Sequence, residues 1–360
     1  MAELVDWDLA ERIAVRAAGR EPLADSYHWD SLEPDFAELT ALAERLVAEE
    51  TGLHSLAGPA RGKVTDRAGW VRANIASFQR LLQPLTERMG RKVAGPSVPV
   101  MRAVAAAEIG LLLGWMSGRV LGQYDLLVAG GSDDEAEAAE DVVYYVGPNV
   151  LGLEKKYGFP PREFRLWLAL HEVTHRAQFT GVPWMREHYL GLIDRTLSAA
   201  GLDPLALLRA LKRAADELRA GRSPLADGGI THLLAGPEQR AALDQIGGLM
   251  SLLEGHGDIT MDRAGAGHVP SAERFGRVLR NRRASATGVT KLVQQLIGLE
   301  AKMNQYQQGE EFITEVERLG GGKGALEPVW RGPSWLPTLA EIREPQEWVE
   351  RVRLSEELVR

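Results

Sequence analysis

The chain has 360 residues, of which 45% are hydrophobic and 26% are charged, so it carries enough apolar material for a large core and is not expected to be disordered. Its 50 acidic side chains outnumber its 42 basic ones, and the formal net charge of −8 argues against nucleic acid as a partner. Cysteine does not occur, which excludes disulfides, thiolate nucleophiles and cysteine metal ligands.

The predicted elements are mainly helices, because apolar residues recur with the helical period along most of the chain. In chain order, the expected helices are 35–50, 66–88, 100–121, 161–180, 184–199, 203–220, 237–263 and 288–306. One strand is expected at 141–146, where a β-branched and aromatic run is stopped by Gly147 and Pro148. The pattern favours a mainly α protein with a short β element.

Three lobes are expected from this order, because the chain is longer than most single domains. An N-terminal helical lobe (1–150) ends in the strand, a helical core (151–264) follows, and C-terminal helices with a Pro- and Trp-rich tail (265–360) come last. From Gly320 onward Pro and Trp are interleaved, and the aromatic side chains are expected to pin this tail to the core.

Location is predicted from the N-terminus and from one apolar stretch. The first eight residues are acidic and lack the features of a signal peptide, so a cytoplasmic protein is expected. The apolar stretch 103–122 contains Glu108 and Arg119, which favours a buried helix of a soluble protein over a membrane span. Glycine recurs in it every four residues, which predicts close packing against another helix. These glycines are Gly110, Gly114, Gly118 and Gly122.

Two other segments are predicted to be loops. Residues 132–141 include six acidic side chains without an ordered ligand spacing, which is typical of a solvated loop. Residues 318–324 resemble a phosphate-binding loop, but Lys323 is followed by Gly324 instead of Ser or Thr.

The strongest chemical motif is His171-Glu172-Val173-Thr174-His175, on the expected helix 161–180. Residues four apart lie on one face of a helix, so both imidazoles can reach one Zn²⁺ ion. Glu172 lies beside them and can act as general base toward an attacking water. The run also contains the Glu-x-x-His of di-iron bundles, but the chain has no second copy, so the di-iron class is disfavoured.

A catalytic zinc site needs a third protein ligand, and Glu254 is the best candidate. It follows an apolar run on the expected helix 237–263, where a carboxylate is costly unless it is paired or binds a metal. Asp258, one turn later, can accept the free ring N–H of a zinc-bound imidazole. His256 points away from Glu254 on an ideal helix, so a core or surface role is favoured over that of a substrate-side donor. The other histidines outside the motif are His28, His54, His188, His232 and His268.

The two motifs together resemble the zincin-like zinc metallopeptidases of actinobacteria, some of which are associated with biosynthesis of the deazaflavin redox coenzyme. The resemblance is carried by 171–179 and 251–256, and further by 66–70 with Asn74, 145–149, and Leu336-Pro-Thr with Trp348. It implies a zincin-like helical fold with a short β element beside the metal-binding helix. It also implies zinc bound by His171, His175 and Glu254, with Asp258 in support. The long interval between His175 and Glu254 departs from the best-known members.

The expected function is therefore that of a zinc-dependent hydrolase, a metallopeptidase or amide hydrolase, acting on a peptide or amide substrate. The alternative is a catalytically silent zincin-like scaffold that binds a protein or cofactor partner. No membrane partner is expected, and the sequence leaves the oligomeric state open. The strand around Tyr145 is expected to be the edge along which an extended peptide pairs. Candidates for stabilising the oxyanion are Tyr144, Tyr145, Tyr189, His256 and His268.

Overall fold

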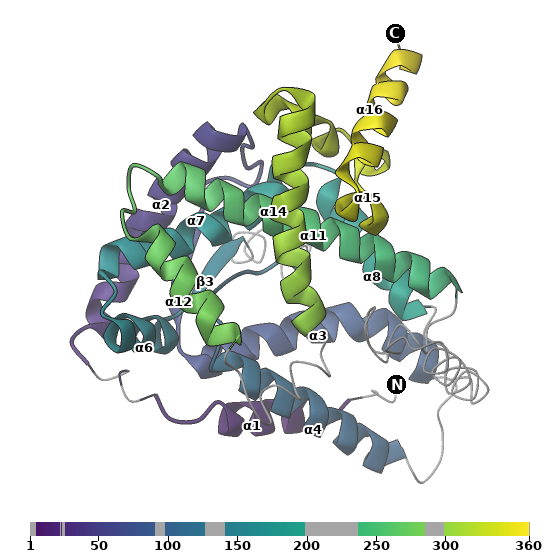
Figure 1. Ribbon diagram of the computed structural model, residues 1–360. Helices are drawn as coiled ribbons and strands as arrows, with labels where there is room; N and C mark the ends of the chain where they lie inside the picture. The colour runs from purple at the N-terminus through teal and green to yellow at the C-terminus, as the bar shows by residue number, and fades with distance from the viewer. Residues whose placement is uncertain are drawn as a thin grey trace. The chain divides into compact units, whose positions relative to one another are not determined.

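The computed structural model describes residues 5–21, 23, 26–90, 98–126, 141–198, 237–284 and 299–359. Over these residues the fold is mainly helical with one small sheet, as predicted (Figure 1). The expected helix 203–220 lies outside the described residues.

Two compact units make up the chain, and each is built from two stretches. Unit 1 comprises Met1–Ala177 and Thr260–Phe275, and unit 2 comprises Gln178–Ile259 and Gly276–Arg360. The expected lobes 1–150, 151–264 and 265–360 stay a prediction.

Unit 1 holds the N-terminal helices, the sheet and most of the helix with the His-Glu motif. Its helices are α1 (Trp7–Ala17), η1 (Trp29–Ser31), α2 (Leu32–Thr51), α3 (Arg67–Gly90), α4 (Val98–Ser117), α6 (Gly147–Tyr157) and most of α7 (Pro161–Thr180). Its strands are β1 (Arg61–Thr65), β2 (Gly122–Tyr124) and β3 (Val142–Val146). The expected bounds of α7 are confirmed. Gly147 and Pro148 end the strand as expected, but they also begin α6, because proline fits the first turn of a helix without losing a hydrogen bond.

The sheet corrects the expectation for Tyr145. Its strand order is β1-β3-β2, with β3 parallel to β1 and antiparallel to β2. The strand that contains Tyr145 is therefore central and has no free edge for a peptide. The Tyr145 ring stacks on Phe36 of α2 at 3.8 Å between centroids, and its hydroxyl pairs with Thr40 at 2.9 Å.

Helix α4 packs closely on α1 through two of the four spaced glycines. A Cβ built on Gly110 would lie 2.6 Å from the Ala10 carbonyl oxygen, and one on Gly114 would lie 2.5 Å from the Ala17 Cβ. Close packing is thus confirmed at these two positions. The helix ends at Ser117, however, and Gly122 belongs to strand β2 instead of the expected helix.

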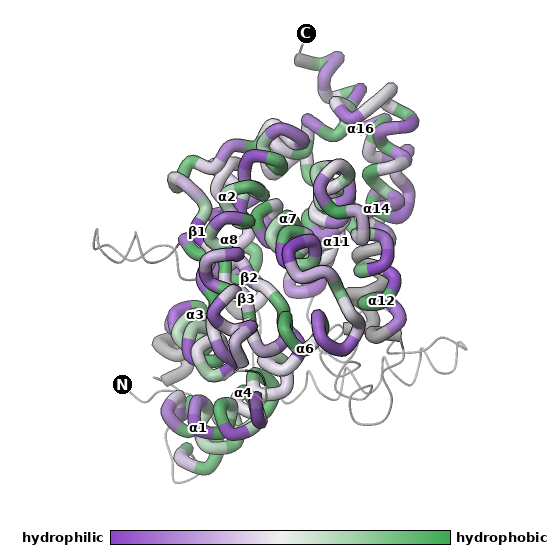
Figure 2. The backbone as a smooth tube through the Cα atoms, turned by 90° about the vertical axis from the view of Figure 1, so that its left-hand side faces the viewer, coloured by the Kyte–Doolittle hydropathy of each residue, from purple (hydrophilic) through white to green (hydrophobic). Residues whose placement is uncertain are grey.

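The expectation that α4 is buried holds for one face only. Among the described residues, α4 is the one helix whose length and apolar composition would allow it to cross a membrane, and only 22% of its apolar stretch is buried. Figure 2 shows its hydrophobic character. Its exposed large apolar side chains are Val100, Met101, Val104 and Leu111. A single helix of this kind is weak evidence for a membrane, because core helices of soluble proteins have the same composition.

Helix α7 is anchored in unit 1 by the buried Arg176. Its guanidinium forms an ion pair with Asp141, donates to Glu44 Oε1 of α2 at 2.7 Å, and donates to the Gly58 carbonyl at 2.6 Å. Asp141 is only 7% exposed, so its expected place in a solvated acidic loop is wrong. It is buried because Arg176 neutralises it. Residues 132–140 of that expected loop lie outside the described residues.

Unit 2 is helical in its described part. Its helices are α8 (Met185–Ser198), most of α11 (Pro237–Gly265), most of α12 (Ala272–Ala284), α14 (Leu299–Gly320), η2 (Lys323–Trp330), η3 (Pro333–Trp335), α15 (Leu339–Arg343) and α16 (Pro345–Val359). Helices α11 and α14 meet at glycines, because a Cβ built on Gly255 would lie 2.3 Å from the carbonyl carbon of Gly309. The expected helix 288–306 overlaps α14, which continues to Gly320.

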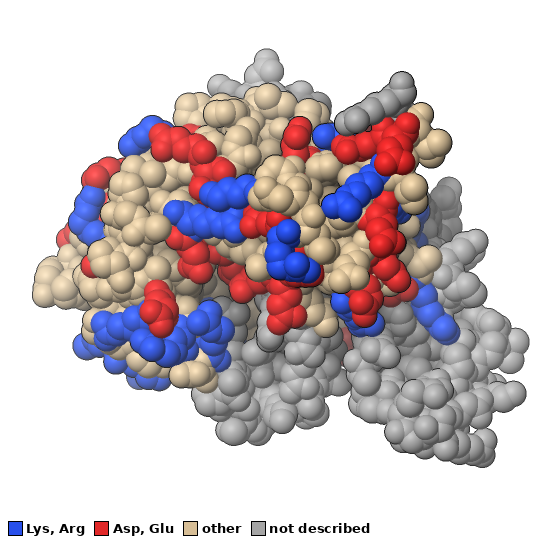
Figure 3. All heavy atoms as spheres, turned by 45° about the horizontal axis from the view of Figure 1, so that its top comes forward, with Lys and Arg blue, Asp and Glu red and all other residues tan. Residues whose placement is uncertain are grey.

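The C-terminal tail is more regular than expected. It consists of η2, η3, α15 and α16, and Trp348 is 1% exposed with its indole N–H donated to the Trp335 carbonyl at 2.9 Å. This hydrogen bond joins two tryptophans of the tail to each other, and the expected pinning of the tail to the core stays a prediction. The expectation of a loop at 318–324 is right only for Gly321 and Gly322, which form the turn after α14 with φ of 85° and 135°. Residues 318–320 are the last residues of α14, and Lys323 and Gly324 begin η2. On the face drawn in Figure 3, acidic and basic side chains of the described residues are mixed.

Candidate metal centre

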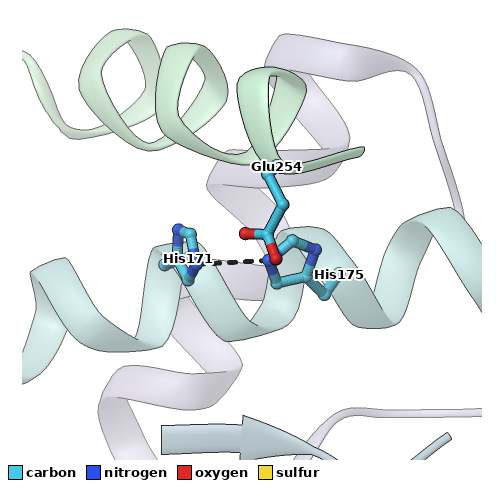
Figure 4. Close-up of side chains that lie close together, drawn as sticks. All are labelled: His171, His175 and Glu254. Carbon is cyan, nitrogen blue, oxygen red and sulfur yellow. Dashed lines mark hydrogen bonds between the residues drawn. The ribbon is translucent and has the colours of Figure 1, made fainter. Parts of the chain in front are cut away.

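The two motif histidines converge on one face of α7. The Nε2 atoms of His171 and His175 lie 3.2 Å apart, and their rings are nearly perpendicular at 89° (Figure 4). Two Zn–N bonds of about 2.0–2.1 Å at a tetrahedral angle place the nitrogens roughly 3.3–3.4 Å apart. The observed separation therefore suits two ligands of one ion.

Glu254 of α11 completes a group of three. One ligand atom from each of His171, His175 and Glu254 lies within 4.8 Å of the other two, and Figure 4 shows the carboxylate directed at both rings. Two imidazoles and one carboxylate form a ligand set of catalytic zinc sites, in which a fourth position stays open. In the part of the chain that the structure describes, no other group of three such side chains is close enough to share an ion.

Helices α7 and α11 also contact each other on both sides of this group. Within unit 2, the Gln178 side chain donates to the Leu253 carbonyl at 2.9 Å. Within unit 1, a Cβ built on Gly265 would lie 3.2 Å from Leu170 Cδ1. Each contact joins residues of a single unit.

His256 is a core histidine and is not part of the ligand group. It is 7% exposed, and its ring meets Trp330 edge-on at 4.9 Å. Gln178 Nε2 lies 3.0 Å from His256 Nδ1 and also donates to the Leu253 carbonyl. Since a carbonyl only accepts, the nearby amide atom is a nitrogen donor, and His256 Nδ1 accepts its second hydrogen. This agrees with the favoured expectation for His256.

Glu172 is buried beside strand β2. It is 9% exposed, and its Oε2 accepts the backbone N–H of Tyr124 at 3.1 Å. A Cβ built on Gly122 would lie 2.7 Å from Glu172 Cγ, so the glycine makes room for this side chain. Neither contact was predicted from the sequence, because a backbone amide leaves no mark in residue type and β2 is too short to show alternation.

The other expected residues take different places. The Tyr145 hydroxyl pairs with Thr40 at 2.9 Å, and burial raises its pKa. Burial raises the pKa of Tyr189 on α8, and the negative charge of Glu254 raises it further. Burial and then Asp125 raise the pKa of Tyr144.

Two polar residues of the expected site region lie in helices. Asp258 is half-buried on α11, one turn after Glu254, and its supporting role stays a prediction. Burial, and then the charge of Arg195, lower the pKa of His188, whose ring packs on Trp184, as is typical of a structural histidine.

The remaining histidines are accounted for by position. His28 precedes η1, His54 follows α2, and His268 follows α11 with its N–H bonded to the Gly265 carbonyl. His232 lies outside the described residues.

Comparisons with known proteins agree with this geometry. Residues 5–349 match the model of a family described as zincin-like metallopeptidases. A crystal structure from Chloroflexus aurantiacus, described as that of a candidate hydrolase with a novel fold, is 30% identical, with a TM-score of 0.70. The similarity covers 97% of this chain and 99% of that one. No functionally curated protein matches.

Proposed function

Because the chain belongs to the zincin-like metallopeptidase family, we propose that it is a zinc-dependent hydrolase of peptide or amide bonds. The observation that carries the proposal is the convergence of His171, His175 and Glu254 within 4.8 Å, with Glu172 next to the first histidine. The related Chloroflexus protein, described as a candidate hydrolase, supports the same reaction class.

His171, His175 and Glu254 would hold the zinc ion, and Asp258 would support one of the imidazoles. Two nitrogen donors and one oxygen donor suit zinc better than calcium or magnesium, which prefer oxygen alone. When bound, zinc acts as a Lewis acid that polarises a carbonyl and lowers the pKa of water.

Glu172 is the proposed general base. Its carboxylate accepts a proton from the attacking water and later delivers it to the nitrogen that leaves when the amide bond breaks. The Tyr124 N–H donates to its Oε2 and holds this oxygen in a fixed direction. Burial at 9% exposure keeps bulk water away from this proton transfer.

We propose a cytoplasmic protein that acts on a peptide or amide substrate and binds neither nucleic acid nor a membrane. The family resemblance also implies an association with deazaflavin-coenzyme biosynthesis in some relatives. We propose that the substrate contains an amide bond, and that the biosynthesis of this coenzyme is one pathway in which to look for such a substrate.

Glu172→Gln tests the proposal, because glutamine keeps the shape of the side chain but cannot accept the water's proton. A peptide and amide library is first screened with wild-type protein at neutral pH. We expect Glu172→Gln to keep its fold and zinc while turnover of each substrate found falls about 100-fold or more. Equal turnover by both proteins would contradict the proposal. A wild type that binds zinc but cleaves no library member would favour the alternative, a silent scaffold.

A further inference from the structure

Glu172 is held by a strand whose own position depends on residues outside the metal motif. We propose that Gln123, anchored by Trp70 and Asn74, is a positioning residue for the Glu172 carboxylate and acts through strand β2. The inference rests on the proposed function, because the direction of this carboxylate affects the rate only if Glu172 transfers a proton. The contacts that carry it all lie within unit 1.

Strand β2 confines the Glu172 side chain at two points. The backbone N–H of Tyr124 donates to Oε2 at 3.1 Å. Two residues earlier, a Cβ built on Gly122 would lie 2.7 Å from Glu172 Cγ and 2.8 Å from Oε1. The hydrogen bond from Tyr124 fixes one carboxylate oxygen, and the backbone at Gly122 leaves no empty space beside the side chain. A small displacement of β2 therefore moves the carboxylate.

Pairing alone holds β2 weakly. It has three residues, Gly122–Tyr124, and among the described strands it lies at the edge of the sheet and pairs with β3 alone. Successive side chains of a strand point to opposite faces, so the Gln123 side chain lies on the face away from Glu172. It is therefore free to bind a different part of the molecule.

That part is helix α3. The Gln123 Oε1 accepts the indole N–H of Trp70 at 2.7 Å and the Asn74 amide at 3.3 Å, while its Nε2 donates to Asn74 Oδ1 at 3.1 Å. Trp70 and Asn74 are 1% and 8% exposed, and Asn74 also donates to the Trp70 carbonyl at 2.9 Å. Hydrogen-bonded side chains that satisfy one another hold a defined geometry, so Gln123, which is partly buried against the buried Trp70 and Asn74, fixes the depth and register of β2.

A second clamp acts on the chain just before β2. The buried Asn149 amide donates to the carbonyls of Ser117 and Val120 at 2.7 and 2.6 Å, and its oxygen accepts the Arg67 side chain at 2.9 Å. The segment that enters β2 is thus fixed at its start, and Gln123 fixes its end.

The amide of residue 124 reports on this coupling directly. Labelling tyrosine with ¹⁵N gives seven backbone amide signals, and Tyr124→Phe identifies the one from residue 124. Glu172→Gln should move that signal upfield, because a charge-assisted hydrogen bond is replaced by a neutral one. Gln123→Leu should move the same signal although Glu172 is intact. Trp70→Phe, which removes one donor and is less disruptive, should move it by a smaller amount.

Thr40→Val is the matched control. It removes a buried hydrogen bond to the Tyr145 hydroxyl on β3 without touching β2, so the signal of residue 124 should stay in place. A signal that stays in place in both Gln123→Leu and Trp70→Phe would overturn the proposal. A signal that moves equally in Thr40→Val would also overturn it, because the response would then be general to the sheet.

Turnover separates this inference from the proposed function. With a substrate from the library screen, Gln123→Leu should lower kcat about 10- to 100-fold while KM and zinc content stay as in wild type. An unchanged kcat together with a moved signal would overturn the positioning role. Failure of the proposed function would appear differently, as a wild-type protein that cleaves no substrate. In that case the amide signal of residue 124 alone tests whether Gln123 positions the Glu172 carboxylate.

Discussion

Gly122 lies directly against the Glu172 side chain and leaves no room there for a side chain of its own. Its φ lies outside the left-handed region, so its backbone accepts alanine and only the added methyl group matters. That methyl would lie 2.7 Å from Glu172 Cγ and must displace it. We expect Gly122→Ala to keep its zinc and to lose about 10-fold or more in kcat, measured on a substrate of the wild-type protein.

Gly152→Ala is the control for this substitution. Gly152 lies in helix α6, and a Cβ there meets nothing within 4 Å. The change should leave kcat unaltered and raise the free energy of unfolding by about 0.5–1 kcal/mol. Equal losses of kcat in both variants, or none in either, would show that Glu172 does not depend on the space at Gly122.

The three residues of the candidate metal group could be singled out from the sequence, because their residue types and spacing indicate metal-binding chemistry, and their role as zinc ligands stays a prediction. His171 and His175 are four apart on a helix, and Glu254 is a carboxylate in an apolar run. The contacts of Glu172 with Gly122 and Tyr124 could not be predicted, since one is a missing side chain and the other a backbone amide.

Helix α7 owes its place in unit 1 to Arg176, whose side chain is 1% exposed and pairs with Asp141 and Glu44. Removing one partner leaves buried charges without compensation, so Arg176→Met should lower the free energy of unfolding by about 3–5 kcal/mol. Urea denaturation followed by tryptophan fluorescence measures the change. A loss below about 1 kcal/mol would contradict a structural role for the network.

Arg162, on the same helix, gives the matched comparison. It also forms two ion pairs, with Asp35 at 3.0 Å and Glu38 at 2.6 Å, but its side chain is 56% exposed. Exposed pairs are screened by water, so Arg162→Met should cost at most about 1 kcal/mol. The difference between the two variants isolates the effect of burial.

Long helices with a clear apolar period could be predicted from the sequence, and short strands could not. The bounds 161–180 of α7 follow from its period and its initial proline. Strands β1 and β2 contain Arg61, Gly62 and Gly122 and show no apolar alternation, so only long-range pairing with β3 defines them. That pairing made β3 central, which sequence pattern alone could not reveal.

The stability of the whole molecule should fall in acid in part through Glu341, in unit 2. Burial alone would raise the pKa of Glu341, but hydrogen bonds from Arg351 and Thr338 and the Arg351 charge outweigh it, so the pKa lies below its ordinary value of 4.5. A carboxylate with a lowered pKa stabilises the folded state fully above its unfolded pKa, and this stabilisation is lost as pH falls through the folded pKa.

We therefore expect Glu341→Gln to cost about 1–2 kcal/mol at pH 7 and less as the pH falls below 4.5, where wild type loses the same contribution. Urea denaturation of both proteins across this pH range measures the difference between their free energies of unfolding. Glu350→Gln, at an exposed position of α16, should stay within about 0.5 kcal/mol of wild type throughout. If the difference in free energy of unfolding between wild type and Glu341→Gln grew as the pH fell, Glu341 would not be stabilised as an anion.

Zinc binding by His171, His175 and Glu254 can be tested by measuring the zinc content of purified wild type, Glu254→Ala and His256→Ala side by side without chelator. We expect close to one zinc per chain in wild type and in His256→Ala, because His256 is a core residue bonded to Gln178. Zinc binding should be much weaker in Glu254→Ala, which lacks the third ligand. Zinc retained in Glu254→Ala but lost in His256→Ala, or iron in place of zinc in wild type, would contradict this assignment.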